Sequence, residues 1–241
     1  MAAPIIRSEA LLLFDIDGTL ILTGGAGIRA MNRAFQEVFG VPDALDGIEV
    51  AGRTDSSILA DAMARHGVAQ EAGATSAFRE RYLACLQAEV PRTPPGPGIG
   101  VLPGVSALLE SLRPVQTAFL GLLTGNYADA AEVKLSHFGL WDYFRCGAFG
   151  DDHPDRNHLV PVALDRARAC GLPPHVGTSR VVVIGDTPRD VACAHAHGAR
   201  CLAVATGIHD AAALARAGAD LVLDDLSDTP RALDALRALL D

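Results

Sequence analysis

Short apolar runs alternate along this chain with longer stretches in which apolar residues recur three and four positions apart. The short runs are rich in leucine and valine, and several end on polar residues. Runs of this length are typical of strands buried on both faces of a parallel sheet, and the longer spacing is typical of amphipathic helices. The strands are expected at residues 11–14, 117–123, 144–149, 180–186, 201–205 and 221–223. Their alternation with helices predicts an α/β fold with a parallel sheet covered on both faces.

Residues 21–90 break this alternation, because they carry only the helical spacing, and we expect this part to be all helical. The segment 91–100 that follows is dense in proline and glycine, which excludes a regular element and is typical of a hinge or linker. The helices are expected at 28–39, 55–67 and 73–90 before this boundary, and at 104–113, 127–138, 158–170, 188–197, 211–217 and 230–240 after it.

Composition narrows the possible partners of the protein. The 241 residues are 49% hydrophobic, with a formal net charge of −9 and a pI near 5.3. An acidic chain without a basic stripe argues against nucleic acid or an anionic membrane as a partner. No apolar run approaches the roughly 18 residues of a membrane span, and no signal-peptide pattern is visible. The five cysteines form no CxxC pair. We therefore expect a cytoplasmic monomer or homodimer whose partner is a small molecule.

Two carboxylates, Asp15 and Asp17, follow the first expected strand directly. Ligands of open α/β sheets bind outside the carboxyl ends of the strands, so both side chains are expected at a binding site. Two acids this close repel each other unless one is protonated or both share a cation. A carboxylate nucleophile, a proton donor and a metal ligand are all possible roles for such a pair. On its own, the pattern is equally consistent with an acidic turn after a strand.

Two further strands also end in polar clusters. Thr124, Gly125 and Asn126 follow the second expected strand, where a hydroxyl and free backbone N–H groups at a helix start favour an anion. Asp186 ends the strand at 180–186, and Asp190 lies one helical turn further along. If these strands are neighbours, the acids supply oxygen ligands for one hard cation, for which Mg²⁺ is the best candidate.

The three clusters together resemble the motifs of the haloacid dehalogenase superfamily, and within it the phosphoglycolate-phosphatase-like hydrolases. The DxDGT motif corresponds to residues 15–19, the Ser or Thr of the second motif to Thr124, and the GDxxxD motif to residues 185–190. The resemblance implies a Rossmann-like three-layer core, formed by residues 1–20 and 104–241. It also implies an inserted all-helical cap at residues 21–103, with a Pro/Gly-rich hinge at 91–104.

The resemblance further implies a magnesium-dependent hydrolysis of phosphomonoesters in two steps. Asp15 would attack phosphorus and form an aspartyl-phosphate, while Asp17 would protonate the leaving oxygen and then activate water. Mg²⁺ would be held by Asp15, the backbone carbonyl of Asp17 and Asp186, with Asp190 close behind. Thr124 and a cationic side chain would bind the phosphate oxygens. Phosphoryl transfer depends mainly on positioning and charge neutralisation, which agrees with this arrangement.

Some residues are expected to contact the substrate rather than to carry the reaction. In the core these are Gly18, Thr19, Gly125 and Asn126. In the cap, Arg53 lies in a Gly-Arg-Thr-Asp loop, where relatives place substrate-contacting residues. The substrate itself stays open between phosphoglycolate, a sugar phosphate and a nucleotide monophosphate.

The family also has a third motif, which lies between the Ser or Thr of the second motif and the GDxxxD motif and supplies the cation that binds phosphate. This chain departs from the family pattern there, because the usual Lys-Pro pair is missing. Lys134 and Arg156 are the two candidates. Lys134 lies in the middle of an expected helix between Val133 and Leu135, which suggests ordinary amphipathic packing. Arg156 lies in a polar loop before the helix that leads to Asp186, where the family's cation belongs, and its fork suits a phosphate oxygen and a carboxylate. We favour Arg156, and expect Lys134→Ala to change activity only a few fold.

Several other functions are weighed against this one. Haloacid dehalogenases proper lack the second acid, and phosphonoacetaldehyde hydrolases need a cap lysine, which residues 1–133 do not contain. A phosphosugar mutase of the β-phosphoglucomutase type remains an alternative, although the missing cap lysine counts against it. A non-catalytic phosphate-binding relative would be expected to lose the acids. The motifs of P-loop and dinucleotide-binding proteins are absent.

Overall fold

A six-stranded parallel sheet forms the centre of the protein. The computed structural model describes residues 6–93, 96 and 98–241. The strands follow the order β5-β4-β1-β6-β7-β8. Their bounds are β1 Ala10–Phe14, β4 Ala118–Leu123, β5 Gly147–Ala148, β6 Val181–Gly185, β7 Arg200–Val204 and β8 Leu221–Leu223. The predicted α/β class and parallel sheet are confirmed, although β5 has only two of the six residues expected at 144–149.

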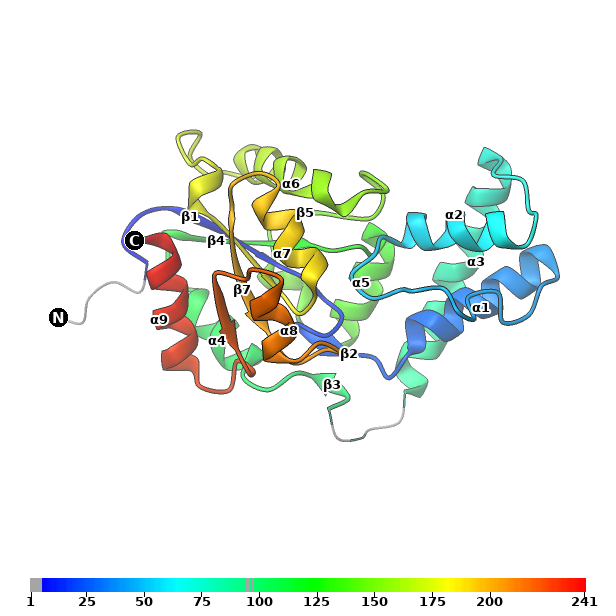
Figure 1. Cartoon of the computed structure of the whole chain (residues 1–241), viewed down its shortest axis with the longest axis horizontal. Coiled ribbons are helices and arrows are strands. Elements are labelled where there is room, and N and C mark those ends of the chain that lie inside the picture. Colours follow the sequence, from blue (N-terminus) through cyan, green and yellow to red (C-terminus); the bar gives the residue numbers. More distant parts are fainter. Residues whose placement is uncertain (1–5, 94–95, 97) are drawn as a thin grey trace.

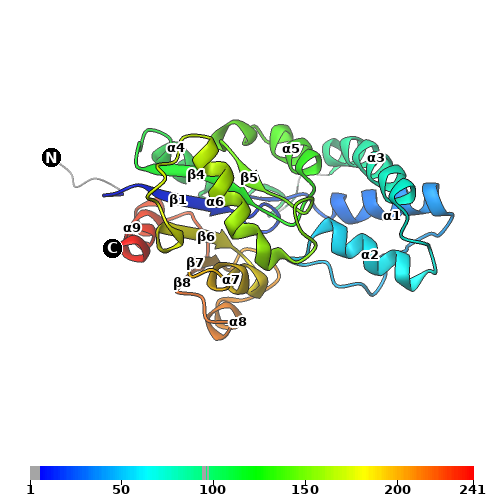
Figure 2. The same cartoon turned by 90° about the horizontal axis from the view of Figure 1, so that it is seen from above.

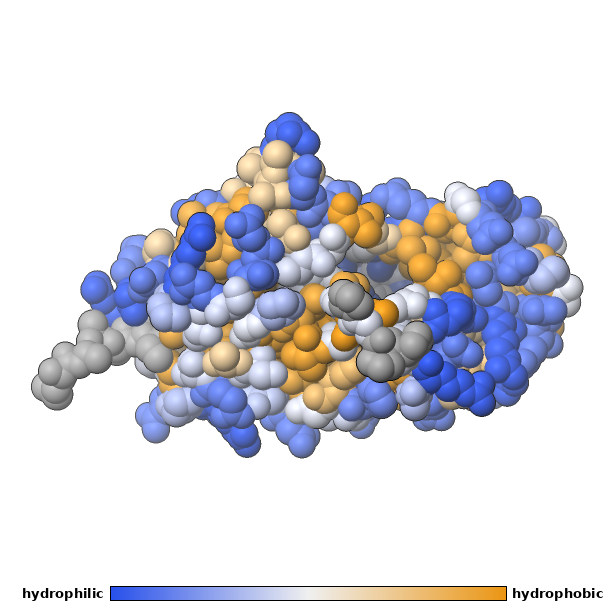
Figure 3. Space-filling view, turned by 90° about the horizontal axis from the view of Figure 1, so that it is seen from below, coloured by the Kyte–Doolittle hydropathy of each residue, from blue (hydrophilic) through white to orange (hydrophobic). Residues whose placement is uncertain are grey.

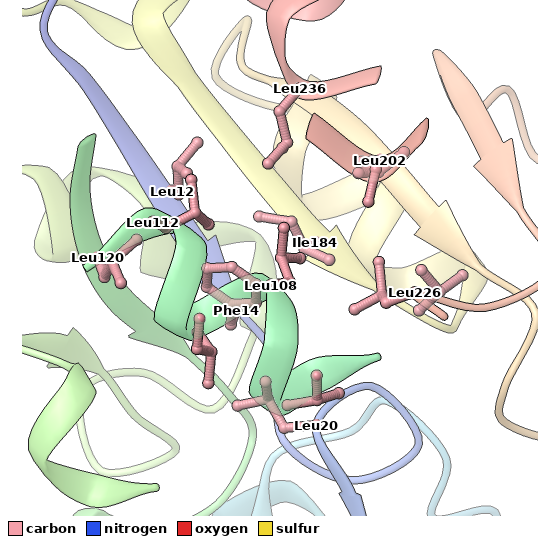
Figure 4. Packing of buried hydrophobic residues seen from close by; sticks show 14 of the residues in the cluster. Leu12, Phe14, Leu20, Leu108, Leu112, Leu120, Ile184, Leu202, Leu226 and Leu236 are labelled. Carbon is pink, nitrogen blue, oxygen red and sulfur yellow. The ribbon is translucent and has the colours of Figure 1, made fainter. Parts of the chain in front are cut away.

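Side chains of the central strands alternate between two hydrophobic clusters, one on each face of the sheet. Leu12 and Phe14 of β1 belong to one cluster, and Leu11 and Leu13 to the other. This follows from the two-residue period of a strand, which sends successive side chains to opposite faces. Figure 4 shows Leu12 and Phe14 packed against Leu108 and its neighbours on the first face.

Helices cover both faces of the sheet, as Figures 1 and 2 show. The face of Phe14 carries α4 Val105–Leu112, α5 Ala128–His137 and α9 Thr229–Leu240. The opposite face carries α6 Leu159–Ala169, α7 Pro188–His195 and α8 Ala211–Arg216. Short 3₁₀ turns stand at η2 Trp141–Tyr143, η3 Arg156–His158 and η4 Thr178–Arg180. The α-helices from α4 to α9 begin and end within two residues of the predicted positions, whereas the 3₁₀ turns were not predicted.

Three further helices form a separate unit beyond the end of the sheet, at the right of Figure 1. They are α1 Ala26–Phe39, α2 Asp55–Arg65 and α3 Ala72–Glu89. Their inward faces build a third hydrophobic cluster, in which Phe35, Phe78 and Tyr82 contact one another in a row. This cluster is distinct from the two on the sheet. Tyr127 and Ala130 at the start of α5 also belong to it, so it joins the helical unit to the main body. Among the described residues, no helix is both long and apolar enough to cross a bilayer.

The two connections to the helical unit pair with each other, which the sequence did not predict. β2 Ile21–Leu22 and β3 Gly100–Val101 form an antiparallel two-stranded sheet. The expectation that residues 21–90 are all helical is therefore wrong at its start, because a two-residue strand is too short to produce a period. The expected boundary segment also contains a 3₁₀ turn, η1 Val90–Arg92. Residues 94, 95 and 97 of the predicted hinge lie outside the described residues.

Candidate active site

The carboxylates that follow β1 lie at the carboxyl edge of the sheet. The N–H of Asp15 donates to the carbonyl of Ile184 on β6 at 2.9 Å, which continues the parallel pairing and fixes the direction of the Asp15 side chain. Asp15 is buried, whereas the side chain of Asp17 is 40% exposed. Gly18 then adopts a φ of +88°, and a Cβ there would lie 2.4 Å from Oδ2 of Asp186. Glycine is needed because any side chain would be strained and would clash.

Three of the predicted acids meet in one cluster. Carboxylate oxygens of Asp15, Asp186 and Asp190 lie within 4.8 Å of one another, and all three residues are buried. Burial raises the pKa of Asp186, and the nearby charges of Asp190 and Asp15 raise it further. Burial also raises the pKa of Asp15, while Arg156 opposes the rise. Buried, crowded carboxylates on rigid strand ends fit a hard divalent cation such as Mg²⁺, which would relieve their repulsion.

Asp190 is more fully bonded than the other two acids. Its Oδ2 accepts the backbone N–H of Thr187 at 2.9 Å and the Thr187 hydroxyl at 2.7 Å, and its Oδ1 pairs with Arg156. Thr187 in turn caps α7, so the two residues form a capping box. Asp186 accepts a single side-chain hydrogen bond from the described residues, from the Thr19 hydroxyl at 3.0 Å. Asp15 and Asp186 are therefore better suited than Asp190 to hold a cation directly.

Arg156 lies in the middle of this cluster. Its side chain is 5% exposed, and its Nη2 lies 3.1 Å from Oδ1 of Asp15 and also pairs with Asp190. The guanidinium donates further to the carbonyl of Leu123 and to the carbonyl of Gly52, both at 3.2 Å. Arg156 thus joins the end of β4, both acids and the helical unit. This is where a third-motif cation is expected, although its role stays a prediction.

The expectation that Lys134 only packs against apolar neighbours is wrong. Lys134 is 4% exposed, and its ammonium donates to Oδ2 of Asp17 and to Oδ1 of Asn126, both at 2.6 Å. α5 begins at the carboxyl edge of the sheet, so a long side chain one to two turns along the helix reaches back to the site. Spacing along the helix could not reveal this. One signal was present, because Lys134 is the single lysine among 20 basic residues.

The second motif forms a small hydrogen-bond network with Asp17. The side-chain amide of Asn126 donates to the Thr124 hydroxyl at 2.8 Å and to Oδ2 of Asp17 at 2.9 Å. Thr124 is fully buried. The Asn126 amide and the Lys134 ammonium thus hold Oδ2 of Asp17 beside the end of β4 and α5.

A loop of the helical unit packs closely onto the same strand ends. The N–H of Asp55 donates to the carbonyl of Gly125 at 2.7 Å, and the Asp55 carboxylate accepts the N–H of Tyr127 at 2.9 Å. A Cβ on Gly125 would lie 1.9 Å from the carbonyl oxygen of Arg53, so glycine permits this approach. Burial raises the pKa of Asp55 to about 7, although Lys134 lowers it. No role at the site was predicted for Asp55 from the sequence. Thr54 is the N-cap, and Asp55 is the first helical residue.

A cavity of about 370 Å³ lies between the strand ends and the helical unit. This volume is typical of a small-molecule site. Most predicted site residues line it, together with Lys134 and Asp55: Asp15, Asp17, Gly18, Arg53, Thr124, Gly125, Asn126, Arg156 and Asp186. Thr19 and Asp190 are buried behind the wall of the cavity. Arg53 lines it, but its guanidinium donates to Asp61 at 2.7 Å and to the carbonyl of Ser57 at 3.1 Å.

Known proteins with similar sequences and folds agree on one family. A family model described as haloacid dehalogenase-like hydrolase matches residues 12–204. A phosphoglycolate phosphatase of Cereibacter sphaeroides is 31% identical over 192 residues, which are 78% of this chain and 82% of that protein. A hydrolase from Pseudomonas syringae has a similar fold, with a TM-score of 0.68, 22% identity, and coverage of 94% of this chain and 99% of that chain. A predicted phosphoglycolate phosphatase from Haemophilus somnus reaches a TM-score of 0.67 at 19% identity, covering 94% and 98%.

The chain belongs to the haloacid dehalogenase-like hydrolase family. Within that family it is a phosphoglycolate-phosphatase-like hydrolase, an enzyme that acts on phosphoric monoesters. The resemblance seen in the three motifs is thereby confirmed. The roles of the single residues stay predictions.

Proposed function

We propose that this protein is a magnesium-dependent phosphatase that hydrolyses a small phosphorylated metabolite through an aspartyl-phosphate on Asp15. The observation that carries the proposal is the cluster of Asp15, Asp186 and Asp190 around Arg156, at the floor of the cavity. The cluster combines a buried carboxylate, a buried cation and carboxylate oxygens close enough to one another to hold a divalent ion. These are the elements that phosphoryl transfer requires.

The first step uses the two acids that follow β1. An oxygen of Asp15 attacks phosphorus while the bond from phosphorus to the ester oxygen breaks, and Asp17 gives its proton to the departing alcohol. Thr124 and Arg156 bind the phosphoryl oxygens, as their positions at the cavity permit. Mg²⁺, held by Asp15, Asp186 and the backbone carbonyl of Asp17, would neutralise charge on the phosphoryl group.

The second step releases phosphate. Asp17 takes a proton from a water molecule, whose oxygen attacks phosphorus as the bond to Asp15 breaks. Asp17 then carries the proton again, so the enzyme returns to its starting state. Lys134 and Asn126 would orient Asp17 for both proton transfers, since both contact its Oδ2.

The helical unit, residues 21–103, would act as a cap that closes over the substrate. The contacts of Asp55 with Gly125 and Tyr127 support this role, because they join the cap loop to the end of β4. Gly24 and Gly25 have φ values of +56° and +81°, which suits a turn that changes conformation. Closure would exclude bulk water while the phosphoryl group is transferred to Asp15, and it would strengthen the electrostatic interactions in the site.

The test combines turnover with trapping of the intermediate. The enzyme with Mg²⁺ is expected to release phosphate from some members of a panel of phosphomonoesters. Reduction of acid-quenched enzyme with borohydride is expected to convert the acyl phosphate on Asp15 to homoserine, which mass spectrometry detects. Asp15→Asn is expected to abolish both signals and to leave the circular dichroism spectrum unchanged. Substantial turnover by Asp15→Asn would refute the covalent mechanism.

The alternatives predict other results in the same assay. A mutase would convert one sugar phosphate into its isomer faster than it releases phosphate. A non-catalytic relative would bind phosphate without turnover. The absence of lysine in residues 1–133 counts against the first, and the presence of both Asp15 and Asp17 at the cavity counts against the second.

A further inference from the structure

Two exposed isoleucines line the cavity and come from distant parts of the chain. Ile28 of α1 is 43% exposed, and Ile208, in the loop after β7, is 78% exposed. Only Val101 joins them as an exposed large hydrophobic side chain in the described part of the protein, and it does not line the cavity. Because both isoleucines contact the cavity and solvent, they lie where the cavity opens. On the face in Figure 3, hydrophobic residues also gather between the main body and the helical unit.

The wall on the side of the helical unit is apolar for most of its extent. It includes Leu22 of β2, Met31 of α1 and Ile58 of α2, as well as Val50 in the loop before α2. The phosphoryl group must lie at the opposite end, near Asp15. The organic part of a bound ester would therefore extend along this apolar wall toward Ile28 and Ile208.

Each positively charged side chain that lines the cavity is already paired with a carboxylate. Arg53 pairs with Asp61 at 2.7 Å, Lys134 with Asp17 at 2.6 Å, and Arg156 with Asp15 at 3.1 Å. This holds for all the arginines and lysines among the described lining residues. Because Arg156 is assigned to the phosphoryl group, a second anionic group on the substrate would have to displace Asp61 from Arg53 or Asp17 from Lys134.

We propose that the substrate is a phosphate monoester whose organic part is uncharged and apolar, and that phosphoglycolate and bisphosphates are poor substrates. This inference rests on the proposed phosphatase activity and names the class of alcohol that the site accepts. Each methylene buried along the wall is expected to raise kcat/KM about fourfold, until the chain passes Ile28 and Ile208 into solvent.

The experiment measures kcat/KM of the magnesium-loaded enzyme for methyl, ethyl, propyl, butyl and hexyl phosphate and for phosphoglycolate. The alkyl alcohols have similar pKa values, so differences among them report binding of the chain rather than leaving-group chemistry. We expect kcat/KM to rise by more than tenfold from methyl to butyl phosphate. The kcat/KM for phosphoglycolate is expected to be lower than that for ethyl phosphate. A flat alkyl series, or phosphoglycolate above butyl phosphate, would overturn the inference. Loss of activity on every ester would instead contradict the proposed function.

Variants of the exposed hydrophobic residues test whether the dependence of kcat/KM on alkyl chain length arises at the apolar wall. Ile28→Ser and Ile208→Ser are each expected to reduce the ratio of kcat/KM for butyl phosphate to kcat/KM for methyl phosphate at least threefold. Little change is expected in kcat/KM for methyl phosphate itself. Val101→Ser removes the third exposed hydrophobic side chain, which does not line the cavity, and is expected to leave the ratio unchanged. An unchanged ratio in both isoleucine variants, or an equal change in Val101→Ser, would refute the assignment of the apolar wall.

Discussion

Removal of Arg156 tests whether one buried cation organises the proposed active site. Its guanidinium contacts two carboxylates, Asp15 and Asp190, and two backbone carbonyls. Arg156→Ala leaves both acids buried without that partner and opens a gap below the cavity. The change therefore affects both stability and catalysis, and the two effects must be measured separately.

The expected loss of stability follows from the burial of the ion pairs. Breaking a buried ion pair by removing one partner costs about 3–5 kcal/mol, because the remaining charge stays uncompensated. Here Asp15 and Asp190 can take up a proton or share a divalent cation, which recovers part of this cost. We therefore expect Arg156→Ala to lower the free energy of unfolding by about 2–4 kcal/mol without metal, and by less with saturating Mg²⁺.

The expected loss of activity follows from the lost charge at the phosphoryl group. Removing one electrostatic donor from a transition state costs about 3–4 kcal/mol, which corresponds to roughly a hundredfold to thousandfold in kcat. Arg156→Lys keeps the charge but cannot reproduce the planar fork, so we expect an intermediate loss of about tenfold. The order of activity should therefore be wild type, Arg156→Lys, Arg156→Ala.

The assay is steady-state phosphate release at saturating Mg²⁺, corrected for the folded fraction from circular dichroism. Arg166→Ala serves as the control, because Arg166 pairs with Asp152 at 2.5 Å and also bonds the carbonyl of Gly147, away from the cavity. We expect the control to stay within threefold of the wild type. Activity of Arg156→Ala within tenfold of the wild type, at an equal folded fraction, would refute the role proposed for Arg156.

Three further predictions concern the metal, Lys134 and Asp55. Chelation is expected to abolish turnover, and Mg²⁺ is expected to restore it. Ca²⁺ should not restore turnover, because its longer and looser coordination disturbs the in-line geometry of the reaction. Full activity in excess chelator would contradict this prediction. Lys134→Ala is expected to lower kcat at least tenfold, more than its sequence position suggests, because it frees the Asp17 carboxylate; kcat within threefold would show that Asp17 needs no such partner. Burial raises the pKa of Asp55 from its ordinary value of 3.8 to about 7, so this carboxyl ionises in the unfolded chain at a lower pH than in the folded protein, and folding stability falls as pH rises from about 4 to 7. Asp55→Asn should remove that loss, so its stability relative to the wild type should be higher at pH 8 than at pH 5. Urea unfolding of both proteins at the two pH values measures this, and an equal difference between variant and wild type at both pH values would refute the prediction.

The strands, the helices of the core and the order of the motifs were predictable because their signals are local. β1 and β6 are apolar on both faces, and this requires a position in the middle of a covered parallel sheet. Once the strands are parallel, residues at their carboxyl ends must gather at one edge. Asp15, Thr124 and Asp186 could therefore be grouped from sequence alone.

The tertiary structure decided how side chains from distant segments meet at that edge. The pairing of Lys134 with Asp17 depends on where α5 begins over the sheet, since a shift of one turn would move the ammonium about 5 Å along the helix axis and break the contact. Asp55 reaches Tyr127 only because the loop of the helical unit folds back onto the end of β4, across 72 positions in sequence. The pairing of β2 with β3 arises in the same way, because two connections that lead to one inserted unit must run side by side. Local propensity and periodicity contain no information on such contacts, because their free energy comes from segments far apart in the chain.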